Sequence, residues 1–327
     1  MGDIMMISSR ILKMICRGSL VVCSGAVAAQ SYPVKPVRIL TCEAGGTCDL
    51  SARMVAQALT ERLGQQIVVE NRGAASGLVA VQSLLNAPAD GYTLLFHSSP
   101  IWLMPFLQDN VPFDPARDLF PISLAARAPL VLVVHASMPV KSVKELIALA
   151  KARPGELDYG SGATGAAPHL AAELFKSMAG VNIVRIAHRG TGAAVIDLVA
   201  GRIPVMFPVL ATIAPHIKTG RVRALAVTTR QPSPLLPGMP TISDSALPGY
   251  DISGVFGLFA AAGTPKSIVI RLSQEMAASL NRSAIRERFF AAGVETVGSS
   301  PEEFAAQVKS EMTTLGKLIR DAGIKSM

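Results

Sequence analysis

Two glycine-rich segments of similar composition carry most of the chemistry that this chain can offer. The first occupies residues 43–49 and the second occupies residues 160–165. Each follows an apolar run and precedes an amphipathic one, which is typical of the turn from a strand into a helix. The first N–H groups of a helix have no partner inside the helix, and the helix dipole places partial positive charge there. Both segments therefore predict sites that bind an anion through main-chain donors.

A few such donors are enough to hold a small ligand. Each charge-assisted hydrogen bond contributes roughly 1.5 to 3 kcal/mol, and micromolar binding requires about 8 kcal/mol. The alternative for either segment alone is that its glycines only permit a tight turn. Because the two segments occupy the same place in two similar halves of the chain, a shared binding site is favoured.

The second segment also spells G-x-G-x-x-G from Gly160 to Gly165, the fingerprint of dinucleotide binding. That function calls for an acidic residue at the end of the next strand, where this chain has Ala187, His188 and Arg189. An arginine suits a 2′-phosphate, but an exported protein would seldom meet a nicotinamide cofactor. We therefore predict no cofactor.

An exported hydrolase is the other catalytic alternative. The patterns G-x-S-x-G and H-E-x-x-H are absent from the sequence, and its five histidines show no metal-ligand spacing. A spatial pair such as Ser161 with His169, or Cys42 activated by a histidine, stays open on sequence grounds. We predict neither a catalytic residue nor a metal site.

Alternating strand and helix signals surround the two segments and predict an α/β fold with mainly parallel sheets. Predicted strands cover residues 37–41, 67–70, 93–96, 130–134, 157–160, 182–186, 204–207, 224–227 and 255–260. Predicted helices cover residues 50–63, 78–85, 143–152, 169–178, 193–200, 266–280, 285–291 and 301–319. The strands at 130–134 and 255–260 would cross between two domains, residues 30–132 plus 254–327 and residues 133–253.

The beginning of the chain predicts export. Arg10, Lys13 and Arg17 precede an apolar run at residues 20–29 that ends in small residues, as in a secretory signal peptide. The run is shorter than the roughly 20 residues that cross a bilayer. We therefore assign residues 1–29 to a signal peptide and expect a soluble mature protein in the periplasm.

The charge and aromatic content of the chain restrict the classes of partner that it could bind. The net charge is +8, but the basic residues are scattered and aromatic residues make up only 5% of the chain, which argues against nucleic acid. Beyond the signal peptide the cysteines are Cys42 and Cys48. In an oxidising compartment they form either a disulfide or two free thiols, and their spacing leaves both alternatives open.

Short motifs along the whole mature chain carry a family resemblance. In order, they occupy residues 32–38, 68–72, 90–95, 169–175, 223–228, 240–241, 247–250 and 262–265. With these motifs the chain resembles the extracytoplasmic solute receptors of tripartite tricarboxylate transporters, also called Bug proteins. Any one motif is weak, but together and in this order they are specific.

The resemblance implies a fold and a function. The fold would be of the periplasmic-binding-protein type II-like class, with two α/β domains that are joined by crossing strands and close over the ligand. The function would be capture of a small carboxylate for the membrane subunits of a transporter, without enzymatic activity. We expect a monomer. A receptor that senses the solute for a membrane regulator is the alternative function.

The resemblance also implies which residues bind the ligand. They come from the glycine segments, from the end of the third strand and from beyond the strand that follows the second segment. They are Gly45, Gly46, Thr47, Asp49, Ser98, Ser99, Ser161, Gly162, Thr164, His169, Arg189, Gly190 and Asp197.

Several positions depart from the family pattern and bear on the identity of the ligand. Glu43 stands where the family has an uncharged residue, and its carboxylate would repel an anionic ligand unless it points away or is paired. Residues 99–102 are bulkier than usual, Pro208 replaces a common aspartate, and Val255 replaces a frequent tryptophan. One hypothesis is an amine-bearing or partly aromatic acid whose ammonium group pairs with Glu43 or Asp197.

Overall fold

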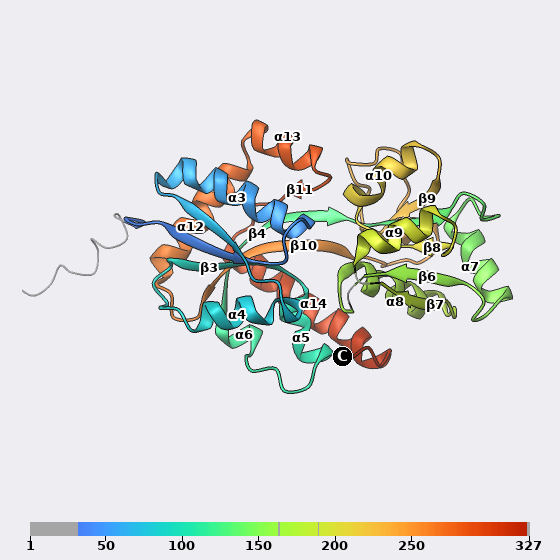
Figure 1. Ribbon diagram of the computed structural model, residues 1–327, viewed down its shortest axis with the longest axis horizontal. Helices are drawn as coiled ribbons and strands as arrows, with labels where there is room; N and C mark the ends of the chain where they lie inside the picture. Colours follow the sequence, from blue (N-terminus) through green and yellow to red (C-terminus); the bar gives the residue numbers. More distant parts are fainter. Residues whose placement is uncertain (1–31, 163, 189, 326–327) are drawn as a thin grey trace, which may run out of the picture.

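The computed structural model describes residues 32–325 with the exception of residues 163 and 189, and it consists of two α/β lobes side by side (Figure 1). The predicted signal peptide at residues 1–29 lies outside the described residues. Among the described residues, no helix combines the length and the apolar character that crossing a membrane requires.

The first lobe is built on a six-stranded sheet with the order β11-β4-β10-β3-β1-β2. Its strands are β1 (Val37–Thr41), β2 (Ile67–Asn71), β3 (Thr93–Ser98), β4 (Leu119–Pro129), β10 (Ser253–Ala261) and β11 (Glu295–Thr296). Its helical segments are α3 (Thr47–Leu63), η1 (Ala75–Gly77), α4 (Leu78–Leu85), α5 (Pro100–Leu107), α6 (Pro115–Asp118), α12 (Lys266–Leu280), α13 (Ser283–Ala291) and α14 (Pro301–Asp321). β1 pairs in parallel with β2 and β3, so their carboxyl ends, with the loops that follow, reach the same edge.

The second lobe contains a five-stranded sheet with the order β7-β6-β8-β5-β9. Its strands are β5 (Val131–His135), β6 (Asp158–Ser161), β7 (Val184–Ala187), β8 (Val205–Met206) and β9 (Val222–Val227). Its helices are α7 (Val143–Ala152), α8 (Ala167–Ala179), α9 (Thr191–Val199), α10 (Leu210–Lys218) and α11 (Ile242–Ser245). The glycine segment at 160–165 follows β6 and leads into α8.

The sheets are mixed and not mainly parallel, which corrects the expectation. β10 runs antiparallel to both of its neighbours, β3 and β4. In the second lobe β5 runs antiparallel to β8 and β9. The physical reason is the chain path: a strand that leaves a lobe and a strand that returns to it must run in opposite directions when they lie side by side.

Two crossings connect the lobes, and one threonine joins them. Only Leu130 separates β4 from β5, while the return path covers residues 228–252. The buried hydroxyl of Thr228 accepts a hydrogen bond from the Leu130 N–H at 3.2 Å and donates one to the Ile252 carbonyl at 2.7 Å. The two crossings therefore meet at the buried Thr228, whose main chain also bonds to Leu130 and Ile252.

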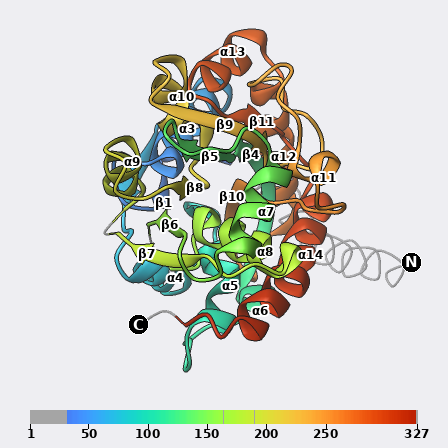
Figure 2. The ribbon, with the colours of Figure 1, turned by 90° about the vertical axis from the view of Figure 1, so that its right-hand side faces the viewer.

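The C-terminal helices pack mainly on the first lobe. α12 lies on α3 and β4, and α14 lies on β4 and α5. α14 also reaches α8 of the second lobe (Figure 2). The rings of Trp102, Phe259 and Phe304 pack together with centroids 4.8 to 6.1 Å apart. This aromatic cluster joins the first sheet to α5 and α14.

Candidate functional site

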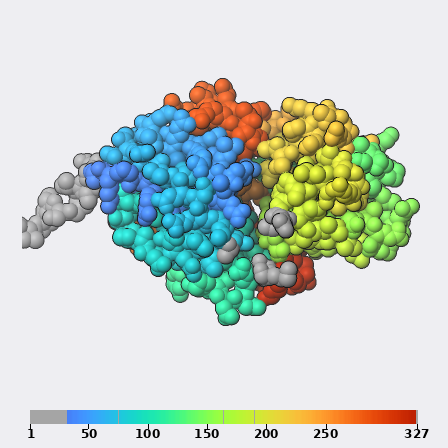
Figure 3. Space-filling model, in the orientation of Figure 1, coloured from blue at the N-terminus to red at the C-terminus, as the bar shows by residue number. Residues whose placement is uncertain are grey.

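A cavity of about 350 Å³ lies between the lobes and receives residues from both. Figure 3 shows the two lobes facing each other along this boundary. The lining residues are Cys42, Glu43, Gly46, Thr47, Cys48, Gly73, Ser76, His97, Ser98, Ser99, Pro100, Thr164, Ala166, Ala167, Pro168, Thr191, Val209, Gly254 and Phe256. Larger hollows of about 700 and 680 Å³ elsewhere contain none of the predicted binding residues.

Helix starts from both lobes converge on this cavity. The first residues of α3, α5, α8 and α9 all line it: Thr47, Pro100, Ala167 and Thr191. Among the described residues, no side chain caps any of these four helices. Elsewhere, serine or threonine hydroxyls cap α7, α11 and α14, whereas α4, α10, α12 and α13 also lack a cap from any described side chain. What distinguishes the cavity is that four uncapped helix starts from both lobes converge on it, which suits it to an anionic ligand.

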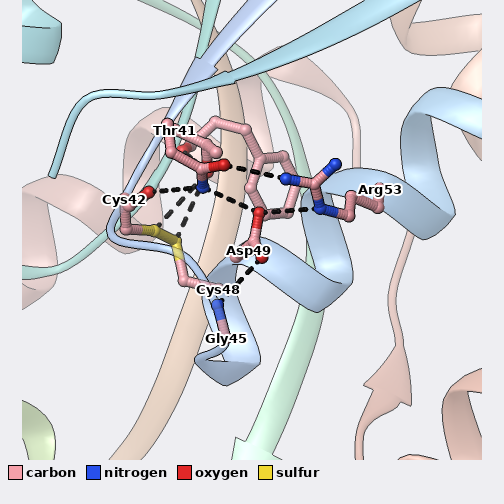
Figure 4. Close-up of polar contacts among 8 residues, drawn as sticks. Thr41, Cys42, Gly45, Cys48, Asp49 and Arg53 are labelled. Carbon is pink, nitrogen blue, oxygen red and sulfur yellow. Dashed lines mark hydrogen bonds and ion pairs between the residues drawn. A yellow bond between two sulfur atoms is a disulfide. The ribbon is translucent and has the colours of Figure 1, made fainter.

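Asp49 holds the first glycine segment in shape (Figure 4). Its carboxylate accepts hydrogen bonds from the Gly45 N–H at 3.0 Å and from the Asn71 amide at 2.8 Å, and it pairs with Arg53 at 3.0 Å. Burial by itself would raise the pKa of Asp49, but the bonds from Asn71, Gly45 and Arg53 outweigh it and lower the pKa. Asp49 is therefore a charged brace behind the loop and not part of the cavity wall.

Cys42 and Cys48 form a disulfide across the same segment, with Cα atoms 6.3 Å apart. This resolves the two alternatives left by the sequence. The bond links the end of β1 to the first turn of α3, and both cysteines line the cavity. The main-chain donors at the start of α3 are thus held by a covalent cross-link.

We expect reduction of this disulfide to lower the free energy of unfolding. The cysteines are only six positions apart, and closing so short a loop stabilises a protein by about 2 kcal/mol in the chain-entropy relation. Urea denaturation of the oxidised protein, the reduced protein and a Cys42→Ser/Cys48→Ser double variant measures this. Ligand affinity should fall with it, because the loop forms one wall. Equal midpoints in all three samples would contradict the expectation.

The second glycine segment is held by an arginine that the sequence analysis missed. Arg185 on β7 donates hydrogen bonds to the Ser161 hydroxyl at 2.7 Å, to the Thr164 hydroxyl at 3.0 Å and to the Gly162 carbonyl at 2.8 Å. A planar guanidinium suits such a set of diverging acceptors. Arg185 therefore fixes the backbone of the loop that precedes α8.

His169 completes this support from within α8. Its Nδ1 accepts a hydrogen bond from the Gly165 N–H at 3.1 Å. Burial, with the nearby Arg185 charge, lowers the pKa of His169 to about 4, so the ring is neutral and Nδ1 is free to accept. Gly165 itself adopts a positive φ of 77° and packs against Leu107 of the first lobe. The loop is thereby braced on both of its sides.

Serines at the end of β3 and a buried histidine form the floor of the cavity. Ser98 and Ser99 line it next to His97, which is 4% exposed. The His97 Nε2 has no hydrogen-bond partner among the described residues, and burial lowers the pKa of His97 to about 4. A neutral imidazole therefore lies beneath the serines at pH 7.

His97 is expected to make the protein sensitive to acid. Its pKa is near 6.5 when unfolded and about 4 when folded, so the unfolded chain binds a proton over this range that the folded chain does not. Stability is therefore lost as the pH falls from 6.5 to 4, by up to about 3 kcal/mol. Urea denaturation at pH 7 and pH 4.5 should show a smaller loss in His97→Asn than in the unchanged protein. An identical loss would contradict this role.

The predicted residues divide into two groups by position. Gly46, Thr47, Ser98, Ser99 and Thr164 line the cavity. The others described do not: Gly45, Asp49, Ser161, Gly162, His169, Gly190 and Asp197. Arg189 lies outside the described residues. Whether the first group contacts a ligand stays a prediction.

Asp197 on α9 is already paired. Its carboxylate bonds to His188 Nε2 at 2.9 Å and to Arg202 at 2.6 Å. The hydrogen bonds from His188 and Arg202 lower its pKa. Of the two acids named in the ligand hypothesis, only Glu43 lines the cavity.

Sequence reasoning missed Thr191, Ser76, Val209 and Phe256 in the lining. Within the described part of the chain, no lysine or arginine lines the cavity, and no group of three His, Cys, Asp or Glu residues could hold a metal ion. The described wall consists of hydroxyls, main chain, apolar groups and one carboxylate. Such a wall suits the binding of a small ligand. Its described side chains show no hydrogen bond between a nucleophile and a general base.

Two α/β lobes whose uncapped helix starts face one shared cavity are the architecture of a two-lobed solute-binding protein. Comparison with known proteins specifies the family: residues 51–324 match the family described as "Tripartite tricarboxylate transporter family receptor". The chain belongs to this family, whose members are receptors and not enzymes.

Relatives and solved structures agree with this assignment. Protein BugT of Bordetella pertussis is 33% identical, with 91% of this chain and 93% of BugT covered. The structure of R. palustris Rpa4515 with adipate is 36% identical with a TM-score of 0.80 and covers 90% of this chain and 100% of that one. MatC from Rhodopseudomonas palustris with bound malate is 25% identical with a TM-score of 0.76, at 88% and 100% coverage.

Proposed function

We propose that this protein is exported to the periplasm, captures a small carboxylate in the cavity between its lobes and delivers it to the membrane subunits of a tripartite transporter. The observation that carries the proposal is the convergence of four uncapped helix starts from both lobes on one cavity of about 350 Å³. The solved structures of Rpa4515 with adipate and of MatC with bound malate support the same class of ligand.

Helix starts are suited to this task because they provide charge without a cationic side chain. Each contributes roughly 0.3 to 1 kcal/mol through its dipole, and each N–H bonded to a carboxylate contributes roughly 1.5 to 3 kcal/mol. Hydroxyls at Thr47, Ser98, Ser99 and Thr191 line the same space and add donors. A ligand that displaces water from the space between the lobes would be contacted by donors from both lobes at once.

Titration calorimetry on residues 30–327 tests the proposal. Adipate and malate are the probes, and adipamide is the matched neutral control because it keeps the length but has no charge. We expect binding of at least one of the two acids and none of adipamide. If adipamide binds as tightly as adipate, or if neither these two acids nor the further carboxylates tested below bind, the carboxylate proposal fails. Uptake of labelled adipate by cells with and without the receptor gene then tests delivery.

We also propose that residues 30–132 plus 254–327 and residues 133–253 move as two bodies. The membership of the two sheets supports a division close to these bounds, since β5 of the second sheet begins at Val131 and β10 of the first sheet begins at Ser253. Thr228 ties the two crossings at the point where rotation would occur. Small-angle X-ray scattering should show a smaller radius of gyration with a bound acid than without. A radius that does not change at saturating ligand would count against this motion.

A further inference from the structure

The wall that the second lobe contributes to the cavity is positively polarised. Arg185 makes three hydrogen bonds to uncharged groups and has no carboxylate partner among the described residues. The first turns of α8 and α9 contain no acidic residue. Glu173 of α8 is paired with Lys176, and Asp197 of α9 is bonded to His188 and Arg202. Among the described residues, therefore, no carboxylate is bonded to Arg185 or to the start of either helix.

Thr164 connects this charge to the cavity. A guanidinium can only donate hydrogen bonds, so Arg185 Nη1 occupies a lone pair of the Thr164 Oγ1. The hydroxyl proton of Thr164 remains available, and Thr164 lines the cavity. A hydroxyl that accepts a hydrogen bond from a cation is polarised by it. Such a hydroxyl donates a stronger hydrogen bond to a carboxylate than an isolated hydroxyl does.

The wall from the first lobe has the opposite character. Asp49 occupies the first turn of α3, and Glu43 precedes that helix and lines the cavity. Glu43 is exposed, and its carboxylate has no hydrogen bond or ion pair with any described residue. The dipole of α3 therefore faces two carboxylates, of which Asp49 is already bonded and Glu43 is not.

We propose that the cavity orients its ligand by charge. The ligand carboxylate lies against the second lobe, where Thr164 donates to it and Arg185 acts as the positioning residue behind Thr164, and Glu43 accepts a hydrogen bond from an ammonium group at the other end. The ligand class is then an amino acid in the broad sense, a carboxylate that carries an amine. This rests on the proposed function and narrows it.

Pairs of equal length test the proposal by calorimetry: adipate with 6-aminohexanoate, and succinate with 4-aminobutanoate. In the unchanged protein we expect the amine-bearing member of at least one pair to bind about 10-fold more tightly. Glu43→Gln should remove this preference, because it keeps the shape of the side chain and eliminates the charge.

Thr164 and Arg185 are tested through the other end of the ligand. Thr164→Val should weaken 6-aminohexanoate about 10-fold but leave its amide, 6-aminohexanamide, unchanged, whereas Thr164→Ser should retain the affinity for both. A purely structural role for Thr164 would change the two ligands together. Arg185→Lys keeps the positive charge but loses the planar guanidinium. Its affinity for 6-aminohexanoate should lie between those of the unchanged protein and of Thr164→Val.

Three outcomes decide the matter. A preference for the amine that disappears in Glu43→Gln supports the proposal. If the dicarboxylates bind as tightly as the amino acids, or if Glu43→Gln leaves the ratio unchanged, the charge orientation is wrong while carboxylate binding stands. If neither adipate, malate nor any member of the two pairs binds, the proposed function fails as well.

Discussion

Replacing Ala166 by aspartate is expected to abolish carboxylate binding while making the protein more stable. Ala166 is the N-cap of α8, has extended backbone angles and lines the cavity. An aspartate there caps the helix, which stabilises a protein by about 1 kcal/mol relative to alanine. The same carboxylate would lie beside the donors that we assign to the ligand and would repel it. We expect affinity for adipate to fall at least about 100-fold.

Ala166→Asn is the matched control for this experiment. Asparagine caps a helix about as well as aspartate but has no charge, so stability should rise equally while affinity falls far less, by about 10-fold or less. Thermal unfolding and calorimetry on the three proteins separate the two effects. An Ala166→Asp protein that binds adipate within a few-fold of the unchanged protein would show that the start of α8 does not hold the ligand.

Gly162→Ala is expected to weaken binding about 10-fold by displacing a helix start. A Cβ at Gly162 would lie 2.9 Å from the Thr191 nitrogen and 3.1 Å from the Gly190 carbonyl carbon. These are main-chain atoms, which cannot move aside as the end of a flexible side chain can. The start of α9 or the loop at Gly162 must therefore shift, which changes the position of the α9 start relative to the other helix starts. Calorimetry with adipate or 6-aminohexanoate measures the loss.

Gly192→Ala provides the control on the same helix. A Cβ at Gly192 meets nothing within 4 Å, so this variant should bind normally and gain slightly in helix stability. If Gly162→Ala binds as tightly as Gly192→Ala, then the start of α9 tolerates displacement and contributes little to recognition.

The order of strands and helices could largely be predicted from the sequence, and the longer missed elements, α5, α10 and β4, share a cause. α5 contains Pro105 and α10 contains Pro215 inside the helix, and proline normally ends a helix. β4 contains Pro121 and Pro129 and is buried along most of its length, so it shows neither an alternating pattern nor the absence of proline that favours a strand. Tertiary packing overrides these local signals.

The place of the site could be predicted from its glycine loops, whereas the role of each polar residue could not. Asp49 lies at the end of the first predicted loop and His169 at the start of the helix that follows the second, but both hydrogen-bond the main chain of the adjoining loop. Short polar side chains beside a turn can bond either to a ligand or to the backbone, and the sequence does not separate these cases. Arg185 was missed because it lies on β7, far in the sequence from the loop at residues 161–164 that it hydrogen-bonds.

The central claim is that a carboxylate lies against uncapped helix starts in the cavity between the lobes. A crystal structure of residues 30–327 with 6-aminohexanoate or adipate tests it most directly. We predict carboxylate oxygens within hydrogen-bond distance of the Ala167 and Thr191 N–H groups and of the Thr164 hydroxyl. A ligand bound elsewhere, or held in this cavity without contact to any of these helix starts, would contradict the account.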